Sequence, residues 1–267
     1  MAVVHELWVD GQPASQADLT YHALFNYGAF TSFGVENGGV RGLDLHLARL
    51  EASALELFGE AVNEGRLRAL IRSALAGRQE AWLRVSLFSP EVWTREPHWI
   101  GAPKVMIGVF TSPAPLAGGV RLQPQVYGRE AAHLKHSATF GLLRARRLAR
   151  QAGFDDALFT DPEGVISEGS LWNIGFWESG EVIWPQATML EGVAQTLIRR
   201  GLDQRKVRQH LRPVTLDDLP DFDGAFLCNS ATPAAAIAAI GDHQFGGATD
   251  LSRMIEAAWR SNPCQTI

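Results

Sequence analysis

Apolar side chains recur at helical intervals in the first part of the chain. Leu43, Leu47 and Leu50 would share one face of a helix, and Gly59 stands where a helix commonly ends. A second helical stretch covers residues 66–76. Short, mostly apolar runs that end at turn residues predict strands at 7–9, 28–36, 82–88 and 104–110. Together these elements form a plausible small α/β unit.

The same periodicities predict a second, larger group of elements after residue 120. Helices are expected at 138–152, 192–202 and 251–259, and strands at 120–127, 157–159, 174–177, 182–184, 225–227 and 237–240. The stretch between the two groups, 111–119, concentrates Pro, Gly and small residues, as interdomain connectors do. We therefore predict an α/β protein with a small N-terminal domain at 1–110, a connector at 111–119 and a larger C-terminal domain at 120–267.

Composition excludes several classes of protein. The 267 residues are 46% hydrophobic and 20% charged, which is ordinary for a globular chain. A net charge of -5 without a long Lys/Arg run argues against a nucleic-acid surface, since phosphate neutralisation needs clustered cations. Cys228 and Cys264 are too few for a disulfide framework, and no run approaches membrane-spanning length. We expect a soluble, cytoplasmic protein that binds neither nucleic acid nor membrane.

Two side chains carry the candidate chemistry. Lys135 lies within His133-Leu134-Lys135-His136, and Glu168 follows the acidic turn at 161–164. A lysine that bonds to an aldehyde cofactor needs an acid partner for the ring nitrogen of that cofactor, and pyridoxal 5'-phosphate (PLP) enzymes supply both from side chains. An isolated lysine or glutamate is usually a solvated surface charge, so the surrounding motifs decide the interpretation.

Five motifs follow one another in a specific order, and two N-terminal segments extend them. The five are Lys135, Glu163-Gly164, Glu168 to Asn173, Leu190-Glu191-Gly192-Val193 and Asn229-Ser230-Ala231-Thr232; the N-terminal pair is Gly28-Ala29-Phe30 and His46-Leu47-Ala48-Arg49-Leu50. In this order they resemble the class IV aminotransferases, the fold-type IV PLP enzymes. That family includes branched-chain and D-amino acid aminotransferases and 4-amino-4-deoxychorismate lyase. The resemblance covers nearly the whole chain.

The resemblance implies fold type IV, with an α+β small domain and a mixed, barrel-like sheet in the larger one. It implies that Lys135 is the catalytic residue that bonds to the PLP aldehyde, and that Glu168 holds the ring nitrogen protonated. It assigns the cofactor phosphate to the backbone N–H groups of Val193 and Ala194, to Ser230 and to Arg49. Asn173 is expected near the cofactor, where it shapes the turn.

The function implied is transfer of an amino group between an amino acid, or another amine, and a 2-keto acid, by a homodimer. The alternatives are 4-amino-4-deoxychorismate lyase, which eliminates pyruvate with the same lysine and cofactor, and a PLP-binding relative without turnover. Departures from the family pattern at Thr31, Ser89-Pro90 and Phe140 leave the substrate open, and Phe140 also leaves the contact to the cofactor ring oxygen unassigned. Glu191 and Gln195 weaken the match of the phosphate-binding loop. His133 and His136 lack an accompanying Cys or acidic ligand pair, so no metal site is expected.

Overall fold

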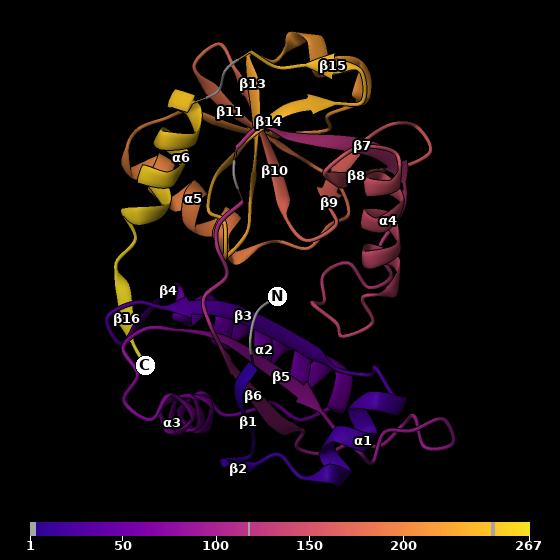
Figure 1. Ribbon diagram of the computed structural model, residues 1–267, viewed down its shortest axis with the longest axis vertical. Helices are drawn as coiled ribbons and strands as arrows, with labels where there is room; N and C mark the ends of the chain where they lie inside the picture. Colours follow the sequence, from indigo (N-terminus) through magenta and orange to yellow (C-terminus); the bar gives the residue numbers. More distant parts are fainter. Residues whose placement is uncertain (1–3, 117, 247–248) are drawn as a thin grey trace. The chain divides into compact units, whose positions relative to one another are not determined.

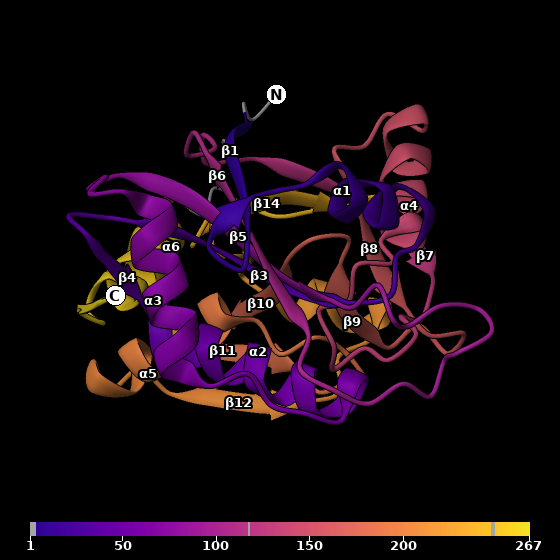
Figure 2. The same ribbon diagram turned by 90° about the horizontal axis from the view of Figure 1, so that it is seen from below.

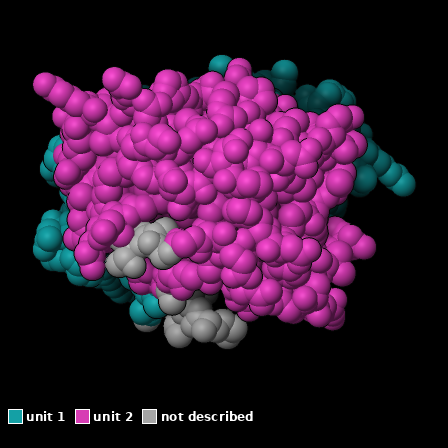
Figure 3. All heavy atoms as spheres, turned by 90° about the horizontal axis from the view of Figure 1, so that it is seen from above, with its two compact units in different colours: residues 1–114, 134–138, 263–267 teal, residues 115–133, 139–262 magenta. Residues whose placement is uncertain are grey.

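The computed structural model describes residues 4–116, 118–246 and 249–267. The chain divides into two compact units, which Figure 3 shows in different colours. Unit 1 comprises the residues up to 114 together with 134–138 and 263–267, and unit 2 comprises 115–133 and 139–262. The predicted division at 111–119 lies close to the first change of unit, but two later segments belong to unit 1. Each unit is described by itself.

Unit 1 is built on an antiparallel sheet. Its strands, in the order β2-β1-β6-β5-β3, are β2 (Gln12–Pro13), β1 (Val4–Val9), β6 (Lys104–Phe110), β5 (Ala81–Phe88) and β3 (Ala29–Val35). The turn between β1 and β2 is formed by Asp10 and Gly11, both with positive φ, as the Asp-Gly pair predicts. The strands predicted at 82–88 and 104–110 are therefore confirmed.

Helices cover both faces of this sheet. α2 (Leu43–Phe58) and α3 (Glu64–Leu75) pack on one face, where alternate residues of β3 and β5 are buried, and α1 (Gln16–Leu24) supplies Tyr21 to a smaller cluster on the other (Figures 1 and 2). α2 and α3 confirm the two predicted helices. Gly59 ends α2 with a φ of 72°, a conformation that a glycine adopts without steric cost.

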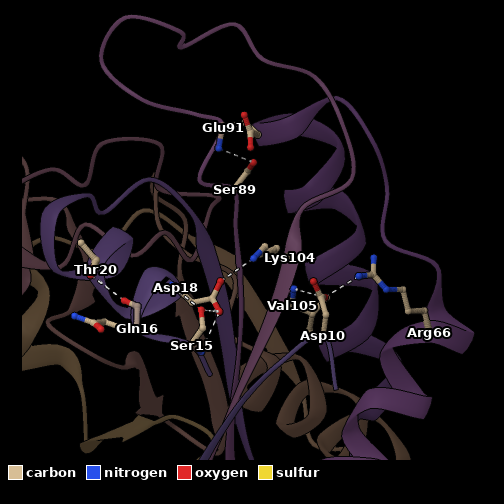
Figure 4. Close-up of polar contacts among 10 residues, drawn as sticks. All are labelled: Asp10, Ser15, Gln16, Asp18, Thr20, Arg66, Ser89, Glu91, Lys104 and Val105. Carbon is tan, nitrogen blue, oxygen red and sulfur yellow. Dashed lines mark hydrogen bonds and ion pairs between the residues drawn. The ribbon is translucent and has the colours of Figure 1, made fainter. Parts of the chain in front are cut away.

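α1 was not predicted from the sequence, although its start carries a local signal. The Asp18 N–H donates to Ser15 Oγ (3.2 Å), and the Ser15 N–H donates to Asp18 Oδ2 (3.1 Å), which is a reciprocal capping box (Figure 4). Lys104 Nζ lies 2.7 Å from Asp18 Oδ1 and ties the helix to β6. Burial opposes ionisation of Asp18, but the hydrogen bonds from Lys104 and Ser15 outweigh it and lower the pKa.

Two segments from late in the chain complete unit 1. The Phe30 N–H donates to the carbonyl oxygen of Lys135, and the Ser137 N–H donates to that of Gly28, each at 2.8 Å. β16 (Cys264–Thr266) pairs antiparallel with β4 (Gly39–Arg41). These bonds explain why 134–138 and 263–267 group with unit 1: backbone pairing binds them to β3 and β4.

Unit 2 is built on a mixed sheet in the order β12-β11-β10-β13-β14-β7-β8-β9, with β15 paired to β14. β11 and β12, β14 and β7, and β7 and β8 pair in parallel. The strands are β7 (Val120–Val126), β8 (Asp156–Thr160), β9 (Ile166–Gly169), β10 (Asn173–Glu178), β11 (Glu181–Pro185), β12 (Gln209–Arg212), β13 (Gly224–Cys228), β14 (Ala235–Ile240) and β15 (His243–Gln244). The hairpin predicted at 174–177 and 182–184 is confirmed as β10 and β11.

Three α-helices and one 3-10 helix pack on this sheet. α4 (Phe140–Gln151) lies against β8, while α5 (Val193–Gln204) and α6 (Thr249–Arg260) lie side by side; the 3-10 helix η1 spans Leu216–Asp221 (Figure 1). α5 and α6 approach closely at Gly201, where a Cβ atom would collide with the carbonyl group of Ala258. Among the described residues, none of the helices has the length and apolar character of a membrane-spanning segment.

Candidate functional site

The chain contains three lysines, and their surroundings differ. Lys104 is paired with Asp18, and Lys206 is exposed just after α5. Lys135 is half-buried, and two backbone hydrogen bonds hold its segment: the Phe30 N–H donates to the Lys135 carbonyl oxygen, and the Ser137 N–H donates to that of Gly28. His136 adds an antiparallel bridge to Ala29. Lys135 thus differs from the other two lysines. It lies outside the named helices and strands, and backbone pairing with a neighbouring strand holds its segment in place.

Phe30 brings two cations to one aromatic ring. The Nζ atom of Lys135 lies 5.1 Å from the centre of the Phe30 ring, and Cζ of Arg84 lies 3.6 Å from it. Phe30 and Arg84 come from neighbouring strands, β3 and β5, on the sheet face opposite α2 and α3. An aromatic face attracts cations, so Phe30 helps to hold both side chains in place.

Arg84 lacks an acidic partner: among the described residues, no carboxylate lies within ion-pair distance of it. Its hydrogen bond from Nε to Ser86 Oγ is long, at 3.4 Å. Burial lowers the pKa of Arg84, and burial together with the charge of Arg84 lowers the pKa of His22. The Nε2 atom of His22 is buried and unpartnered within the described part of the chain. A half-buried guanidinium beside a neutral imidazole can bind a carboxylate from outside the protein.

The opposite face of β3 carries a second polar pair. Thr31 and His46 are both buried, and Thr31 Oγ1 lies 2.6 Å from His46 Nδ1. Burial, with a further contribution from the positive charges of Arg49 and Lys135, lowers the pKa of His46 to about 3. His46 is therefore neutral at physiological pH. Within unit 1, Arg49 and Lys135 thus both lie near enough to His46 for their charges to lower its pKa.

Glu168 is 4% exposed and lies on β9 of unit 2. Its Oε1 atom accepts a hydrogen bond from the Leu190 N–H (3.3 Å) and lies 3.7 Å from Nη1 of Arg129. The side chains of Glu168 and Arg129 are both 6% exposed. Glu168 is therefore a buried carboxylate with a buried cation beside it, and Arg129 was not among the predicted site residues.

Asn173 connects the Glu168 segment to the start of α5. Its Nδ2 atom donates to the carbonyl oxygen of Leu190 (2.8 Å), and a Cβ atom at Gly192 would collide with its Oδ1 atom. α5 begins after Gly192 with no side-chain cap on its N–H groups. Gln195, in its first turn, is 1% exposed, and its Oε1 atom has no partner among the described residues. The start of α5 therefore offers the uncapped N–H groups that an anion needs.

Ser230 lies in a tight turn beside the same region. Asn229 Oδ1 accepts hydrogen bonds from the N–H groups of Ala231 (2.9 Å) and Thr232 (2.8 Å), so the turn closes on Asn229. Asn229 Nδ2 donates to the carbonyl oxygen of Leu171 (3.2 Å). Asn173 and Cys228 are also partners between β10 and β13. Unit 2 therefore brings the segments of Glu168, Asn173, Val193, Ala194 and Ser230 together.

A buried carboxylate supports the turn from Glu168 to Asn173. Asp156 is 2% exposed and accepts hydrogen bonds from Ser170 Oγ (2.6 Å) and Trp172 Nε1 (3.1 Å). Arg146 Nε lies 3.4 Å from its Oδ2 atom. A Cβ atom at Gly169 would collide with the Trp172 indole, so glycine permits this close packing. The network anchors the turn to β8.

Four of these residues were not predicted from the sequence: His22, Arg84, Arg129 and Asp156. Arg84 carries a weak signal, because it is the one charged position within the apolar strand 81–88. The others become visible only when distant strands pair. Lys135 and Arg49 lie in unit 1, whereas the other predicted site residues lie in unit 2. Among the described residues, no three of His, Cys, Asp and Glu gather as metal ligands would.

Comparison with known proteins identifies the family. A family model described as amino-transferase class IV matches residues 28–240. The branched-chain-amino-acid aminotransferase of Pseudomonas aeruginosa is 23% identical, over 90% of this chain and 86% of that protein. The aminodeoxychorismate lyase of Vibrio harveyi is 24% identical, over 87% and 90%. Relatives with two different named activities are thus about equally similar.

Solved structures show the same fold. The branched-chain amino acid aminotransferase of Escherichia coli has a TM-score of 0.83 at 17% identity, covering 97% of this chain and 94% of that one. The 4-amino-4-deoxychorismate lyase of Pseudomonas aeruginosa has a TM-score of 0.81 at 23% identity, covering 96% and 98%. A further similar structure, also a branched-chain aminotransferase, contains pyridoxamine 5'-phosphate. The chain therefore belongs to the class IV aminotransferase family, whose members are PLP-dependent enzymes, and has the fold-type IV architecture of that family.

Proposed function

We propose that the protein is a PLP-dependent aminotransferase that moves an amino group between an amino acid, or another amine, and a 2-keto acid. The observation that carries this proposal is the setting of Lys135: its carbonyl oxygen accepts a hydrogen bond from the Phe30 N–H of β3, and its amine lies beside the Phe30 ring, which Arg84 also contacts. When bound, PLP supplies an aldehyde that accepts the amino group and a ring that stabilises negative charge at the α-carbon of the substrate.

The residues of unit 2 fit the ring and the phosphate of PLP. Glu168 is a buried carboxylate suited to hold a protonated ring nitrogen. The uncapped start of α5 supports the assignment of Val193 and Ala194 N–H groups to the phosphate, and glycine at 192 permits the close approach of Asn173 Oδ1 to this turn. Ser230 and Arg49 complete the proposed phosphate ligands. Asn173 is proposed to hold the loop before α5 through its bond to Leu190.

The remaining roles belong to side chains of unit 1. Lys135 is proposed to bond to the cofactor aldehyde and, once displaced by the substrate amine, to carry the proton taken from the substrate α-carbon. Arg84 and the neutral His22 are proposed to bind a carboxylate of the substrate, because no carboxylate among the described residues lies within ion-pair distance of Arg84 and its charge is available to an incoming anion. The enzyme is proposed to act as a homodimer.

Borohydride reduction followed by peptide mapping tests the assignment of Lys135. The wild-type protein, reconstituted with PLP and reduced, should carry the cofactor on the peptide that contains Lys135, and Lys135→Ala should carry none. Lys206→Ala is the matched control, since Lys206 is exposed, and it should be labelled like the wild type. A covalent adduct on Lys104 or Lys206 would overturn the assignment.

A second function, 4-amino-4-deoxychorismate lyase, is favoured by the lyases among the similar proteins. A simple assay distinguishes the two activities. Incubation with a series of amino donors should convert the cofactor to its aminated form if the protein is an aminotransferase. Release of pyruvate from aminodeoxychorismate, without a response to any donor, would assign it as a lyase. A cofactor spectrum that no substrate changes would indicate a binding protein without turnover.

A further inference from the structure

A buried ion pair joins Glu168, the residue proposed to hold the cofactor ring nitrogen, to Arg129. None of the family motifs in the sequence includes Arg129. Nη1 of Arg129 lies 3.7 Å from Oε1 of Glu168, and both side chains are 6% exposed. By contrast, the side chains of the ion pair between Arg253 and Asp250 are 75% and 97% exposed. Burial makes the Arg129–Glu168 pair a different kind of interaction, because water screens it far less.

Strand order explains how the two residues meet. Glu168 lies on β9, which pairs with β8, and β8 pairs in parallel with β7. The chain leaves β7 at Val126, and the Tyr127 N–H still donates to the carbonyl oxygen of Thr160 on β8 (3.0 Å). Arg129 follows two residues after Tyr127. In the sheet, β8 lies between β7, which precedes Arg129, and β9, which carries Glu168. The parallel register of β7 and β8 therefore sets the position of the guanidinium.

The same carboxylate oxygen also accepts the Leu190 N–H at 3.3 Å. Glu168 Oε1 thus faces a guanidinium and a backbone donor, both of which favour the ionised carboxylate. Without a cation, burying this carboxylate would be costly, and the side chain would tend to take up a proton. An ionised Glu168 is what the proposed pairing with a protonated ring nitrogen requires.

We propose that Arg129 is the counter-charge of Glu168: it keeps this carboxylate ionised in the interior before cofactor binds, and it limits how tightly the carboxylate then holds the proton on the cofactor ring nitrogen. The second effect follows from electrostatics, since a carboxylate shared by two cations attracts each of them less than it would attract one alone. Arg129 is therefore a positioning residue that tunes the acidity of the site. The second half of the proposal rests on the proposed function, whereas the first does not.

The first half is tested on the cofactor-free, full-length protein with a double-mutant cycle. The cycle comprises the wild type, Arg129→Met, Glu168→Gln and the double variant, each unfolded in urea at pH 8. Arg129→Met should lower the folding equilibrium constant by about tenfold or more when residue 168 is Glu, because it removes a guanidinium from beside a buried carboxylate. The loss should be several times smaller when residue 168 is Gln. An equal loss in both backgrounds would show that Arg129 acts through packing alone and would overturn the proposal.

The pH dependence of the unfolding free energies gives a second, independent test of the first half. In Arg129→Met, burial of Glu168 is no longer opposed by the guanidinium, so its pKa should rise above the unfolded value of about 4.3. A group with a raised folded-state pKa loses stability as the pH rises, so the deficit of Arg129→Met should grow between pH 5 and pH 8. A deficit that is constant with pH, or that shrinks, contradicts the proposed coupling. Arg253→Met, which breaks an exposed pair, serves as the control and should change the folding constant less than about twofold.

The second half of the proposal is tested by measuring the protonation of the cofactor ring nitrogen. Wild type and Arg129→Met are loaded with PLP labelled with ¹⁵N in the ring, and the nitrogen chemical shift is followed as the pH is raised. The variant should keep the ring proton to a higher pH than the wild type, by about one pH unit or more, and unchanged titration would overturn this half. If neither protein binds PLP, the proposed function and this half fail together, while the coupling measured without cofactor stands or falls by itself.

Discussion

The hydroxyl of Thr31 and the imidazole of His46 share a hydrogen bond of 2.6 Å in the core of unit 1, between β3 and α2. Thr31 is fully buried and follows Phe30, whose ring contacts the Lys135 amine from the other face of the strand. The pair therefore fixes the strand that bonds to the backbone of Lys135. Thr31 points into the core, so it helps to set the packing beneath the strand that bonds to Lys135.

His46 should make the stability of the protein depend on pH. Its folded-state pKa is about 3, whereas an unfolded histidine titrates near 6.5, so the unfolded chain takes up a proton first as the pH falls. The contribution of His46 is complete above about pH 6.5 and should decline toward pH 3, by at most about 1.4 kcal/mol per pH unit. Urea unfolding of the wild type and His46→Gln between pH 4 and pH 8 measures this component. His98→Gln, at an exposed position, should keep the wild-type slope; a wild-type slope in His46→Gln would contradict the assignment.

Asp156 should be important for the turn that carries Glu168. Asp156→Asn replaces an ionised acceptor of two buried donors, and we expect a loss of about 2–4 kcal/mol in the free energy of unfolding. Ser170→Ala should cost about 1–2 kcal/mol, and less when Asp156 is already Asn. Urea unfolding measures these values, and Asp250→Asn, at a fully exposed position, is the control. A near-neutral Asp156→Asn would show that the network does not stabilise the turn.

Gly201 should tolerate no side chain, because α5 and α6 are in contact there. A methyl group at this position would collide with the carbonyl group of Ala258, so Gly201→Ala should destabilise unit 2 by about 1–3 kcal/mol despite the better helix propensity of alanine. Gly65→Ala, in the exposed first turn of α3, is the matched control and should change the midpoint little, since a Cβ atom there meets only the Asn63 side chain. Thermal unfolding of the two variants tests this prediction, and equal midpoint temperatures would argue against close contact at Gly201.

Arg84 should determine how carboxylate-bearing substrates bind. Arg84→Met should raise KM for an amino acid donor by about tenfold or more, since a charge-assisted hydrogen bond to the carboxylate is lost. An amine without a carboxylate should be affected much less. Arg147→Met, on the exposed face of α4, is the control. The same change in KM for both kinds of donor would refute a role of Arg84 in carboxylate binding.

Regular periodicity makes much of the fold predictable from the sequence. The leucines and Gly59 predict α2, and two apolar runs around Ser179-Gly180 predict the hairpin of β10 and β11, because these signals are local. α1 escapes prediction because it is short and only weakly amphipathic, so its capping box is the main clue. Ends of helices differ by one or two residues, as fraying of terminal turns leads one to expect.

The candidate site is predictable where motifs carry it and not where strand pairing creates it. Lys135, Glu168 and Gly192 stand in motifs that are visible in the sequence. Arg129 meets Glu168 because β8 pairs with β9, which carries Glu168, and with β7, the strand that precedes Arg129; that relationship has no local signature. Likewise, nothing near Lys135 in the sequence indicates that its backbone pairs with β3, about 100 residues earlier.

Unit 1 draws on three separated stretches of chain, and this has a consequence for folding during synthesis. β4 lacks its partner β16 until residues 264–266 have left the ribosome, and β3 lacks the strand-like segment around Lys135 until residues 134–138 have emerged. β3 and β4 are thus synthesised well before the segments that pair with them. While translation proceeds, the edges of this unit stay open to chaperones, or to wrong partners, for longer than their position in the sequence would suggest.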